Sequence, residues 1–262
     1  MTMEIRIIHR GEHDITFIVE GVDASFVNAL RRVFLGEIPV FAMDYVIFYN
    51  NTSPLYDEII SHRLGMVPLT SETDRYIPAD QCCEEGCEKC SVTLSLSKEG
   101  PCMVLSGDLI SEDADVVPVY DNIPIVKLSA RQKLTVNAIA RMGYGRDHAK
   151  WQGALASYQH VPKIEVNTEM CDLGGACIEV CPRNVLDIMD NQLVPKYLYL
   201  CNLCNACNDI CDYDAITVTP IPDSFIFRLE SYGCMSVKPL IDKVIEIFDE
   251  KIENFLEEVK KL

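Results

Sequence analysis

Hydrophobic and polar positions at the start of the chain predict a β-hairpin followed by a helix. The runs "EIRIIHR" and "DITFIVEGV" are rich in β-forming residues and are joined by the polar "GEHD". Asp23 then suits the N-cap of a helix. Apolar residues recur at steps of three and four along one face of that helix, namely Phe26, Leu30, Val33 and Phe34. This region therefore presents one apolar helical face.

The end of the chain predicts a strand followed by a long amphipathic helix. The run "SFIFRLESYG" is strand-like, and Pro239 fits the first turn of the helix that follows. The apolar stripe of this helix consists of Leu240, Val244, Ile247 or Phe248, Ile252, Phe255 and Val259. Packing against the chain's own sheet would account for one such stripe. Ile241, Ile245 and Leu256 widen the apolar surface, which favours a protein interface.

Composition indicates the size of the protein, its cellular compartment and its charge. The chain has 262 residues, 48% of them hydrophobic, which suffices for one large or two modest domains. It has no apolar run of transmembrane length, and its charged N-terminus does not fit a signal peptide. We expect a soluble, cytoplasmic protein with no membrane contact. The formal net charge of −17 repels phosphate backbones, so no direct contact with nucleic acid is expected.

Two stretches of the chain carry cysteines in the same register. They are "CDLGGACIEVCPRNVLDI" (171–188) and "CNLCNACNDICDYDAITV" (201–218). The coinciding pairs are Cys171 with Cys201, Cys177 with Cys207, and Cys181 with Cys211. Thirteen cysteines in a reducing compartment favour metal ligation over disulfides. The repeat is typical of two-cluster ferredoxins, in which the last cysteine of each motif binds the cluster of the other motif.

When the last cysteine of each motif is assigned to the other motif, one set has four thiolates and is complete. The set consists of Cys181, which precedes a proline, together with Cys201, Cys204 and Cys207. Two-residue gaps return the backbone to the same small region of space, which suits an iron-sulfur cluster. Zinc is the alternative, but zinc sites usually come as two separated CxxC pairs. We therefore predict a [4Fe-4S] cluster at this set.

The second set lacks one ligand. It consists of Cys171, Cys177 and Cys211. Gly174 stands where the other motif has Cys204. Such a site could hold a [3Fe-4S] cluster, a [4Fe-4S] cluster with a ligand other than cysteine, or no cluster. Asp172 lies nearby but out of register, so the spacing does not identify it as a ligand.

Three blocks of the chain resemble the α-type subunits of RNA polymerase. The first, "NALRRVFLGEIPVFAMDYVIFYNNTSPLYDEIISHRLGMVPL" (28–69), is similar to the dimerisation segment of that family. "GYGRDHAKWQGALASYQHVPKIEV" (143–166) is similar to its HAKW-type segment, and "FIFRLESYG" (225–233) resembles the strand before its last helix. Bacterial members lack the cysteine insert. The resemblance covers nearly the whole chain and is closest to the archaeal D-type members, which are equivalent to the eukaryotic third-largest polymerase subunit and some of which carry a ferredoxin-like domain at this place.

The resemblance implies an α+β fold in three parts. Residues 1–40 and 223–262 would form an interleaved dimerisation domain, 41–165 a mostly β insert domain, and 166–222 a ferredoxin-like iron-sulfur domain. In the family, the helical surface binds a smaller α-like subunit L, and this pair nucleates assembly with subunits N and P and the large catalytic subunits. The implied interface residues are Phe26, Leu30, Phe34, Val244, Phe248 and Phe255.

A third cysteine cluster, "CCEEGCEKC" (82–90), lies in an acidic stretch. Cys87 and Cys90 form a CxxC pair, whereas the adjacent Cys82 and Cys83 must bend sharply to share one metal ion. The stretch resembles the zinc loop of the eukaryotic counterpart with one spacer residue missing. A zinc site and a metal-free loop whose thiols oxidise on isolation are the two alternatives.

Two functions are compatible with these patterns. One is a non-catalytic assembly platform of a DNA-directed RNA polymerase, whose iron-sulfur domain stabilises the subunit or tunes assembly through its redox state. The other is a ferredoxin-like electron carrier, which has no use for dimerisation helices at both ends of the chain. The sequence has no GxSxG, HExxH or P-loop motif, so no catalytic residue is assigned.

Overall fold

The computed structural model describes residues 2–71, 75–82 and 89–262. Helices and antiparallel sheets both occur in these residues, which confirms the α+β class. The chain divides into two compact units. The first unit comprises Met1–Arg10, Thr16–Ala29 and Ser157–Arg228, and the second comprises Gly11–Ile15, Leu30–Ala156 and Leu229–Leu262. Each unit takes part of the predicted dimerisation domain, and the limits of the three predicted domains stay a prediction.

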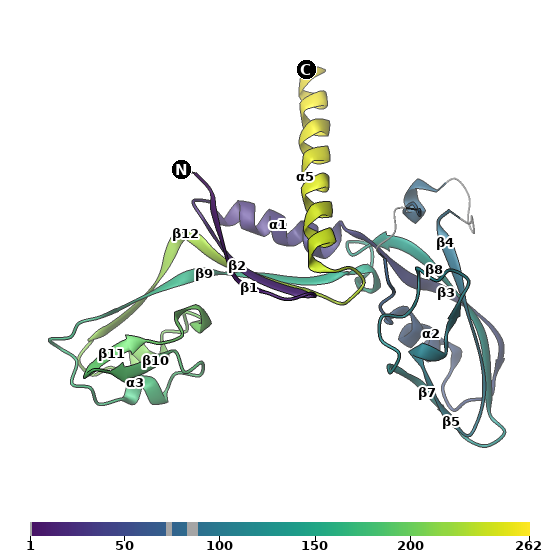
Figure 1. The fold of residues 1–262 in the computed structure, drawn as a ribbon, viewed down its shortest axis with the longest axis horizontal. Helices are drawn as coiled ribbons and strands as arrows, with labels where there is room; N and C mark the ends of the chain where they lie inside the picture. The colour runs from purple at the N-terminus through teal and green to yellow at the C-terminus, as the bar shows by residue number, and fades with distance from the viewer. Residues whose placement is uncertain (1, 72–74, 83–88) are drawn as a thin grey trace. The chain divides into compact units, whose positions relative to one another are not determined.

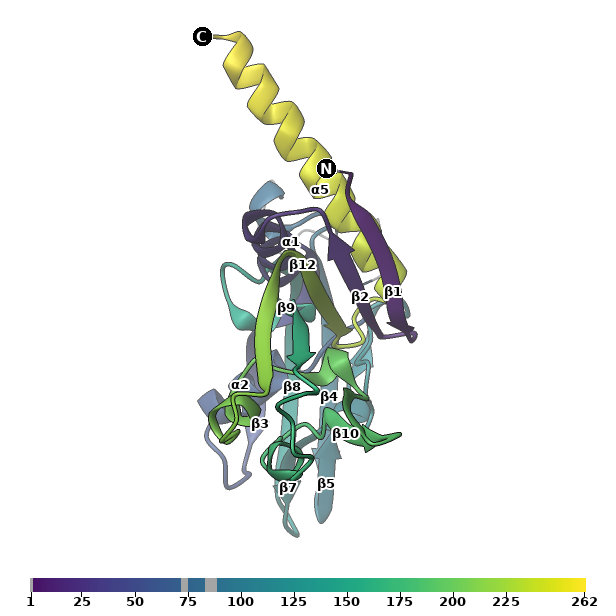
Figure 2. The same ribbon diagram turned by 90° about the vertical axis from the view of Figure 1, so that its left-hand side faces the viewer.

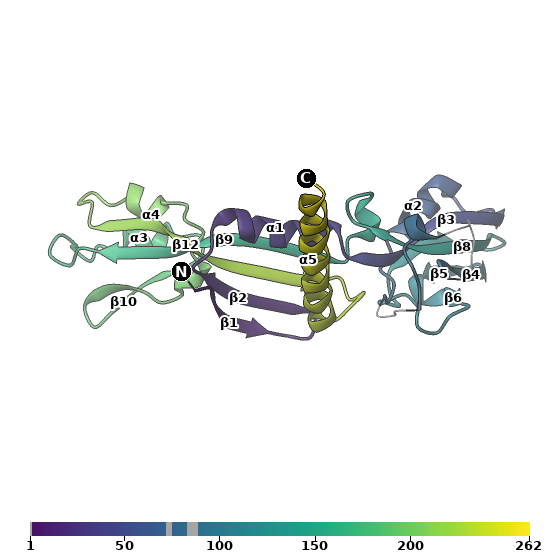
Figure 3. The same ribbon diagram turned by 90° about the horizontal axis from the view of Figure 1, so that it is seen from above.

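Most of the first unit is built on a four-stranded sheet with the order β1-β2-β12-β9 (Figure 3). These strands are β1 (Glu4–Arg10), β2 (Asp14–Glu20), β12 (Ile216–Ser231) and β9 (Ala154–Val166). The predicted hairpin is confirmed, because β1 and β2 are neighbours (Figure 2) and the Gly11 N–H donates to the Asp14 carbonyl at 2.8 Å. β1 is the edge strand and is exposed along its whole length.

Helix α1 (Ala24–Gly36) follows the hairpin, as the apolar spacing predicts. The Phe26 N–H donates to the Asp23 carboxylate at 2.9 Å, which confirms Asp23 as the N-cap. The Ser25 hydroxyl also donates to this carboxylate, and these bonds lower the pKa of Asp23. The cap therefore satisfies backbone and side-chain donors in the first turn of the helix.

The cysteine repeat forms two short motifs with matching backbones. Helices α3 (Ala176–Glu179) and α4 (Ala206–Asp209) occupy the same place in each motif. Three pairs of residues in register have positive φ, and they are Leu173 with Leu203, Gly175 with Asn205, and Asn184 with Asp214. Strands β10 (Leu186–Met189) and β11 (Gln192–Pro195) form a hairpin between the motifs. A 3-10 turn, η4 (Leu198–Leu200), then leads into the second motif, and the internal repeat is thereby confirmed.

The second unit contains two sheets and a helix around the largest core. The first sheet has the order β3-β8-β4-β6, from Pro39–Asn51, Lys133–Tyr144, Ser91–Glu99 and Ile110–Ser111. The second pairs β5 (Cys102–Leu105) with β7 (Pro124–Leu128). Helix α2 (Asp57–Gly65) buries Ile60 and Leu64 in this core. Short 3-10 turns are η1 (Ala79–Gln81), η2 (Ser106–Asp108) and η3 (Ala149–Trp151).

The last helix of the second unit, α5 (Val237–Lys260), confirms the predicted strand-to-helix order (Figure 1). Its first turns bury Val237, Leu240 and Val244. Further along, the Lys251 ammonium pairs with the Glu37 carboxylate at 2.7 Å. Every residue from 249 to 262 is exposed. No helix in the described part of the chain is both long and apolar enough to cross a membrane.

Candidate iron-sulfur sites and assembly surface

The fold gathers the cysteines of the repeat into two sets. One cavity is lined by Cys181, Cys201, Cys204 and Cys207. A separate cavity is lined by Cys171, Cys177 and Cys211. Each set therefore takes its last cysteine from the other motif, in the arrangement that the repeat predicts. This grouping supports the two ligand sets.

Backbone amides point at the exchanged thiols. The Val185 N–H donates to Sγ of Cys181 at 3.4 Å, and the Ala215 N–H donates to Sγ of Cys211 at 3.3 Å. These bonds occupy the same place in the two motifs. Hydrogen bonds to the ligating sulfur atoms are among the contacts through which a protein tunes an iron-sulfur cluster.

Three of the other thiols lie in a less polar environment, and they are those of Cys177, Cys201 and Cys207. Burial raises the pKa of Cys207 to about 11, and the nearby thiols of Cys201 and Cys181 add to the effect. Burial likewise raises the pKa of Cys177, which lies beside Cys171. A cluster would supply the positive iron charge that thiolates at these buried positions require.

The arrangement of the thiols fits a multi-iron cluster. The thiols of each set line a cavity. In a cubane cluster each thiolate binds a different iron, so the ligands surround a cavity and do not converge on one point. A cluster held by these cysteines would cross-link the two motifs and could exchange one electron.

Contacts that the sequence did not predict tie the complete set to the sheet of its own unit. The side-chain amide of Gln159, on β9, donates to the Cys201 carbonyl at 3.0 Å. The Arg228 guanidinium on β12 donates to the Tyr199 carbonyl at 3.1 Å, and that of Arg6 on β1 donates to the Tyr199 hydroxyl at 2.8 Å. Tyr199 also packs on the buried Ile226. The residues that lead into Cys201 are thus held by three strands.

The predicted zinc loop is described in part. Cys83 and Cys87 lie outside the described residues. Cys82 is half-buried and Cys90 is buried. Zinc at this loop stays a prediction.

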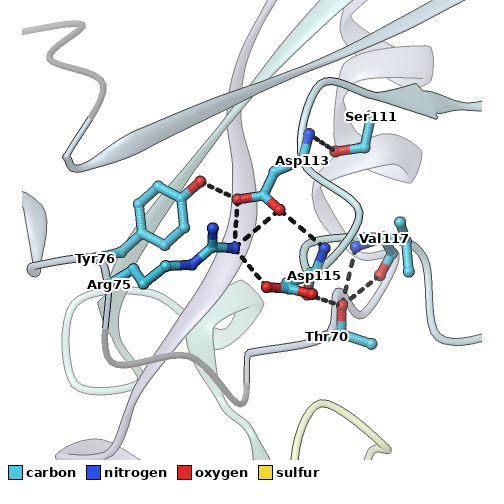
Figure 4. Close-up of polar contacts among 7 residues, drawn as sticks. All are labelled: Thr70, Arg75, Tyr76, Ser111, Asp113, Asp115 and Val117. Atoms are coloured by element: carbon cyan, nitrogen blue, oxygen red, sulfur yellow. Dashed lines mark hydrogen bonds and ion pairs between the residues drawn. The ribbon is translucent and has the colours of Figure 1, made fainter.

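A polar network joins the segment before this loop to a second loop of the insert (Figure 4). The Arg75 guanidinium donates to both oxygens of Asp113, at 3.0 and 2.9 Å, and also pairs with Asp115. The Tyr76 hydroxyl donates to Asp113. This bond, with others from the network, lowers the pKa of Asp113. Burial, followed by the bond to Asp113, raises the pKa of Tyr76 to about 12. The network fixes the residues on one side of the cysteine loop.

The six predicted interface residues differ in burial. Phe26 of α1 and Phe255 of α5 are exposed, Leu30 and Phe248 are half-buried, and Phe34 and Val244 are buried within the chain. Helical spacing places all six on apolar faces but cannot tell whether a face is covered by the same chain or by a partner. The two buried residues pack within the chain itself, so the exposed members are the ones available for a partner.

The second half of α5 exposes further large apolar side chains. They are Ile245, Ile252, Phe255, Leu256 and Val259, with exposed fractions of 54%, 55%, 67%, 49% and 45%. We call these five residues the α5 stripe. Single exposed apolar residues are ordinary on protein surfaces, but a run of this length along one helix is typical of an interaction surface.

Comparison with known proteins identifies two family models within the chain. The RNA polymerase Rpb3/RpoA insert domain matches residues 46–161, and a 4Fe-4S binding domain matches residues 164–187. The second match includes Cys171, Cys177 and Cys181 and supports an iron-sulfur cluster in the repeat.

Full-length relatives are also found among curated proteins. The DNA-directed RNA polymerase subunit Rpo3 of Methanosarcina acetivorans is 38% identical over 98% of each chain. That of Methanothermobacter thermautotrophicus is 40% identical over 97% of this chain and 98% of its own. That of Thermococcus kodakarensis is 40% identical over 99% of each chain.

Proposed function

The chain belongs to the family of DNA-directed RNA polymerase subunit Rpo3, and we propose that it is the cytoplasmic assembly platform of that enzyme. It is a subunit of the polymerase and is not an enzyme by itself. In this role it binds a small α-like subunit L through its helices. The pair then nucleates assembly with the small subunits N and P and with the large catalytic subunits, without direct contact with nucleic acid.

The α5 stripe carries this proposal. Phe255 is 67% exposed, and its neighbours along the stripe are large aliphatic residues. Burial of apolar surface is the dominant favourable term in most protein association, so a complementary apolar helix is the partner that this surface fits. Phe26 on α1 adds a second exposed aromatic residue. A monomeric electron carrier has no need of such a surface.

The iron-sulfur domain supports the platform from a different part of the chain. We propose a [4Fe-4S] cluster at Cys181, Cys201, Cys204 and Cys207 that stabilises the repeat. The hydrogen bond from Gln159 to the Cys201 carbonyl connects this site to β9. Loss or oxidation of the cluster would loosen this connection, which is a route by which redox state could tune assembly.

A capture experiment with tagged chain and co-expressed subunit L tests the proposal. Phe255→Asp places a charge in the α5 stripe and should abolish capture, because a charge buried in an apolar interface costs several kcal/mol. The matched control is Asn254→Asp, which adds the same charge at the adjacent exposed position and should leave capture intact. Phe34 is unsuitable for this test because it is buried, and an aspartate there would unfold the chain.

The result also separates the platform from the electron carrier. Equal capture by Phe255→Asp and Asn254→Asp would show that the stripe is not the interface. Capture should survive Cys204→Ser, because that residue lies in the repeat and not on α5. A chain that exchanges electrons with a reductase and binds no subunit L would instead be a carrier.

A further inference from the structure

We propose that the carboxylate of Asp172 is the fourth ligand of the incomplete set, so that Cys171, Cys177 and Cys211 hold a four-iron cluster together with one oxygen ligand. The inference rests on the proposed iron-sulfur role of this domain. It goes further by naming a ligand that the spacing of the motif does not reveal.

The position of the carboxylate is the first observation. Gly174 is in register with Cys204, and the φ angles on either side of these two positions agree in sign. A Cβ atom added at Gly174 would lie 3.2 Å from both Oδ1 and Oδ2 of Asp172. The carboxylate therefore lies in close contact with the position that the Cβ atom of the missing cysteine would take.

The carboxylate is also held in place. The Gly174 N–H donates to Oδ1 of Asp172 at 2.9 Å. Among the described residues, no group donates a hydrogen bond to Oδ2, so this oxygen is available to bind a metal ion. Asp172 lines the same cavity as the three cysteines of the set.

The size of the cavity is a third observation. It measures about 100 Å³ and is lined by the three cysteines and Asp172. Apolar side chains, among them Ile188, Leu193 and Ile216, line the cavity without filling it.

The two motifs differ at two nearby positions, and the second difference offsets the first. The motif with the fourth cysteine reads "CNLC", and the motif without it reads "CDLG". Asn202 thus stands in register with Asp172, so an amide accompanies the cysteine and a carboxylate accompanies its absence. A carboxylate oxygen is a harder ligand than a thiolate, and we expect it to hold its iron less tightly. Loss of that iron would leave a three-iron cluster bound by the three cysteines.

Anaerobic reconstitution of the full chain with iron and sulfide tests the assignment. The wild-type chain should bind about eight irons. Asp172→Asn keeps the shape and an oxygen that can accept from Gly174, but it removes the charged ligand. We expect this variant to lose about one iron per chain as Fe²⁺ and, after one-electron oxidation with ferricyanide, to show the paramagnetic resonance signal of an oxidised three-iron cluster.

Two further variants make the result specific. Asn202→Asp places a carboxylate beside the complete set and should change neither the iron content nor the spectrum. Asp172→Asn combined with Gly174→Cys supplies the missing thiolate and should restore the four-iron cluster, which excludes misfolding as the cause of the loss.

Two outcomes would overturn the inference. A wild-type chain with only about four irons would show that the incomplete set holds no cluster. A full iron content in Asp172→Asn would show that water or another group supplies the ligand. Either result leaves capture of subunit L unaffected, so failure of this inference is distinct from failure of the platform role.

Discussion

Two of the hydrophobic cores of the molecule differ in the residues that build them. The core of the insert contains twenty buried residues among those described, and none of these is a cysteine. The core of the iron-sulfur repeat contains seven, of which Cys201 and Cys207 are two. Four more of its cysteines are partly buried against it, namely Cys171, Cys177, Cys181 and Cys211.

This difference indicates what each region needs in order to fold. The insert buries twenty apolar side chains between its sheets and α2, and such burial is the main stabilising contribution to folding. The repeat places its candidate ligands where a larger domain would place aliphatic side chains. Small domains with so little core usually depend on a metal or on disulfides. We therefore expect metal dependence in the repeat and none in the insert core.

The largest effect should follow from Cys204→Ser. Removal of one thiolate from the complete set should release its cluster and loosen residues 166–222, because the cross-link between the motifs is lost. Hydrogen exchange should rise throughout this range and stay unchanged in the insert. Iron analysis after anaerobic reconstitution provides the second measurement.

Cys102→Ser is the control for this variant, because Cys102 is half-buried and lies outside the repeat. It should keep the iron content of the wild-type chain. An unchanged iron content in Cys204→Ser itself would show that the ligand assignment is wrong.

The converse experiment removes aliphatic packing from the insert. Leu94 is fully buried there, so Leu94→Ala should lower the free energy of unfolding of the insert by about 2–5 kcal/mol. Iron content should not change. Chemical denaturation followed in parallel with iron release would measure both quantities. Simultaneous loss of iron would mean that the two regions unfold together. The different composition of their cores would then not correspond to separate stabilities.

A smaller effect is expected where the complete set meets the sheet. Gln159→Leu removes the donor to the Cys201 carbonyl and should cost about 1 kcal/mol. Hydrogen exchange should rise near residues 198–204 before any loss of iron. Gln192→Leu is the control, because Gln192 is an exposed residue of β11. Equal effects of the two substitutions would contradict a specific connection between β9 and the cluster site.

The smallest effect concerns pH and the network around Asp113. Hydrogen bonding, first from Tyr76, keeps the pKa of Asp113 below its usual value. The folded state therefore gains stability from this carboxylate above the ordinary aspartate pKa, and this stability is lost as the pH falls through the lowered value. Tyr76 affects stability at alkaline pH. The folded state favours its neutral form, and the stability gained in this way is lost as the pH rises toward its pKa of about 12.

Thermal unfolding of the insert between neutral and acidic pH would measure this dependence. Asp113→Asn should lower the unfolding temperature at neutral pH and flatten its decline in acid. A decline of the same size in the variant would assign the pH dependence to other carboxylates.

Several features were determined by the sequence alone because they are local. The N-terminal hairpin, the Asp23 cap of α1 and the final strand and helix depend on alternation, helical spacing and capping within a few residues. The cysteine repeat is equally local, and the structure confirms it in matched backbone angles. The family likewise follows from the sequence, because full-length relatives are 38% to 40% identical to it. The ligand sets, the zinc loop and the domain limits stay predictions.

Other features were decided by tertiary structure because they depend on packing between distant segments. Helical spacing placed Phe34 and Phe255 on apolar faces, but the fold buries the first and exposes the second. Gln159 reaches Cys201 across 42 residues of sequence, a contact that no local pattern encodes. Register did not identify Asp172 as a ligand, yet the fold places its carboxylate 3.2 Å from where a Cβ atom at Gly174 would lie. The spacing of residues along a helix or strand determines on which face a side chain lies. Whether that face is buried depends on the distant segments that pack against it.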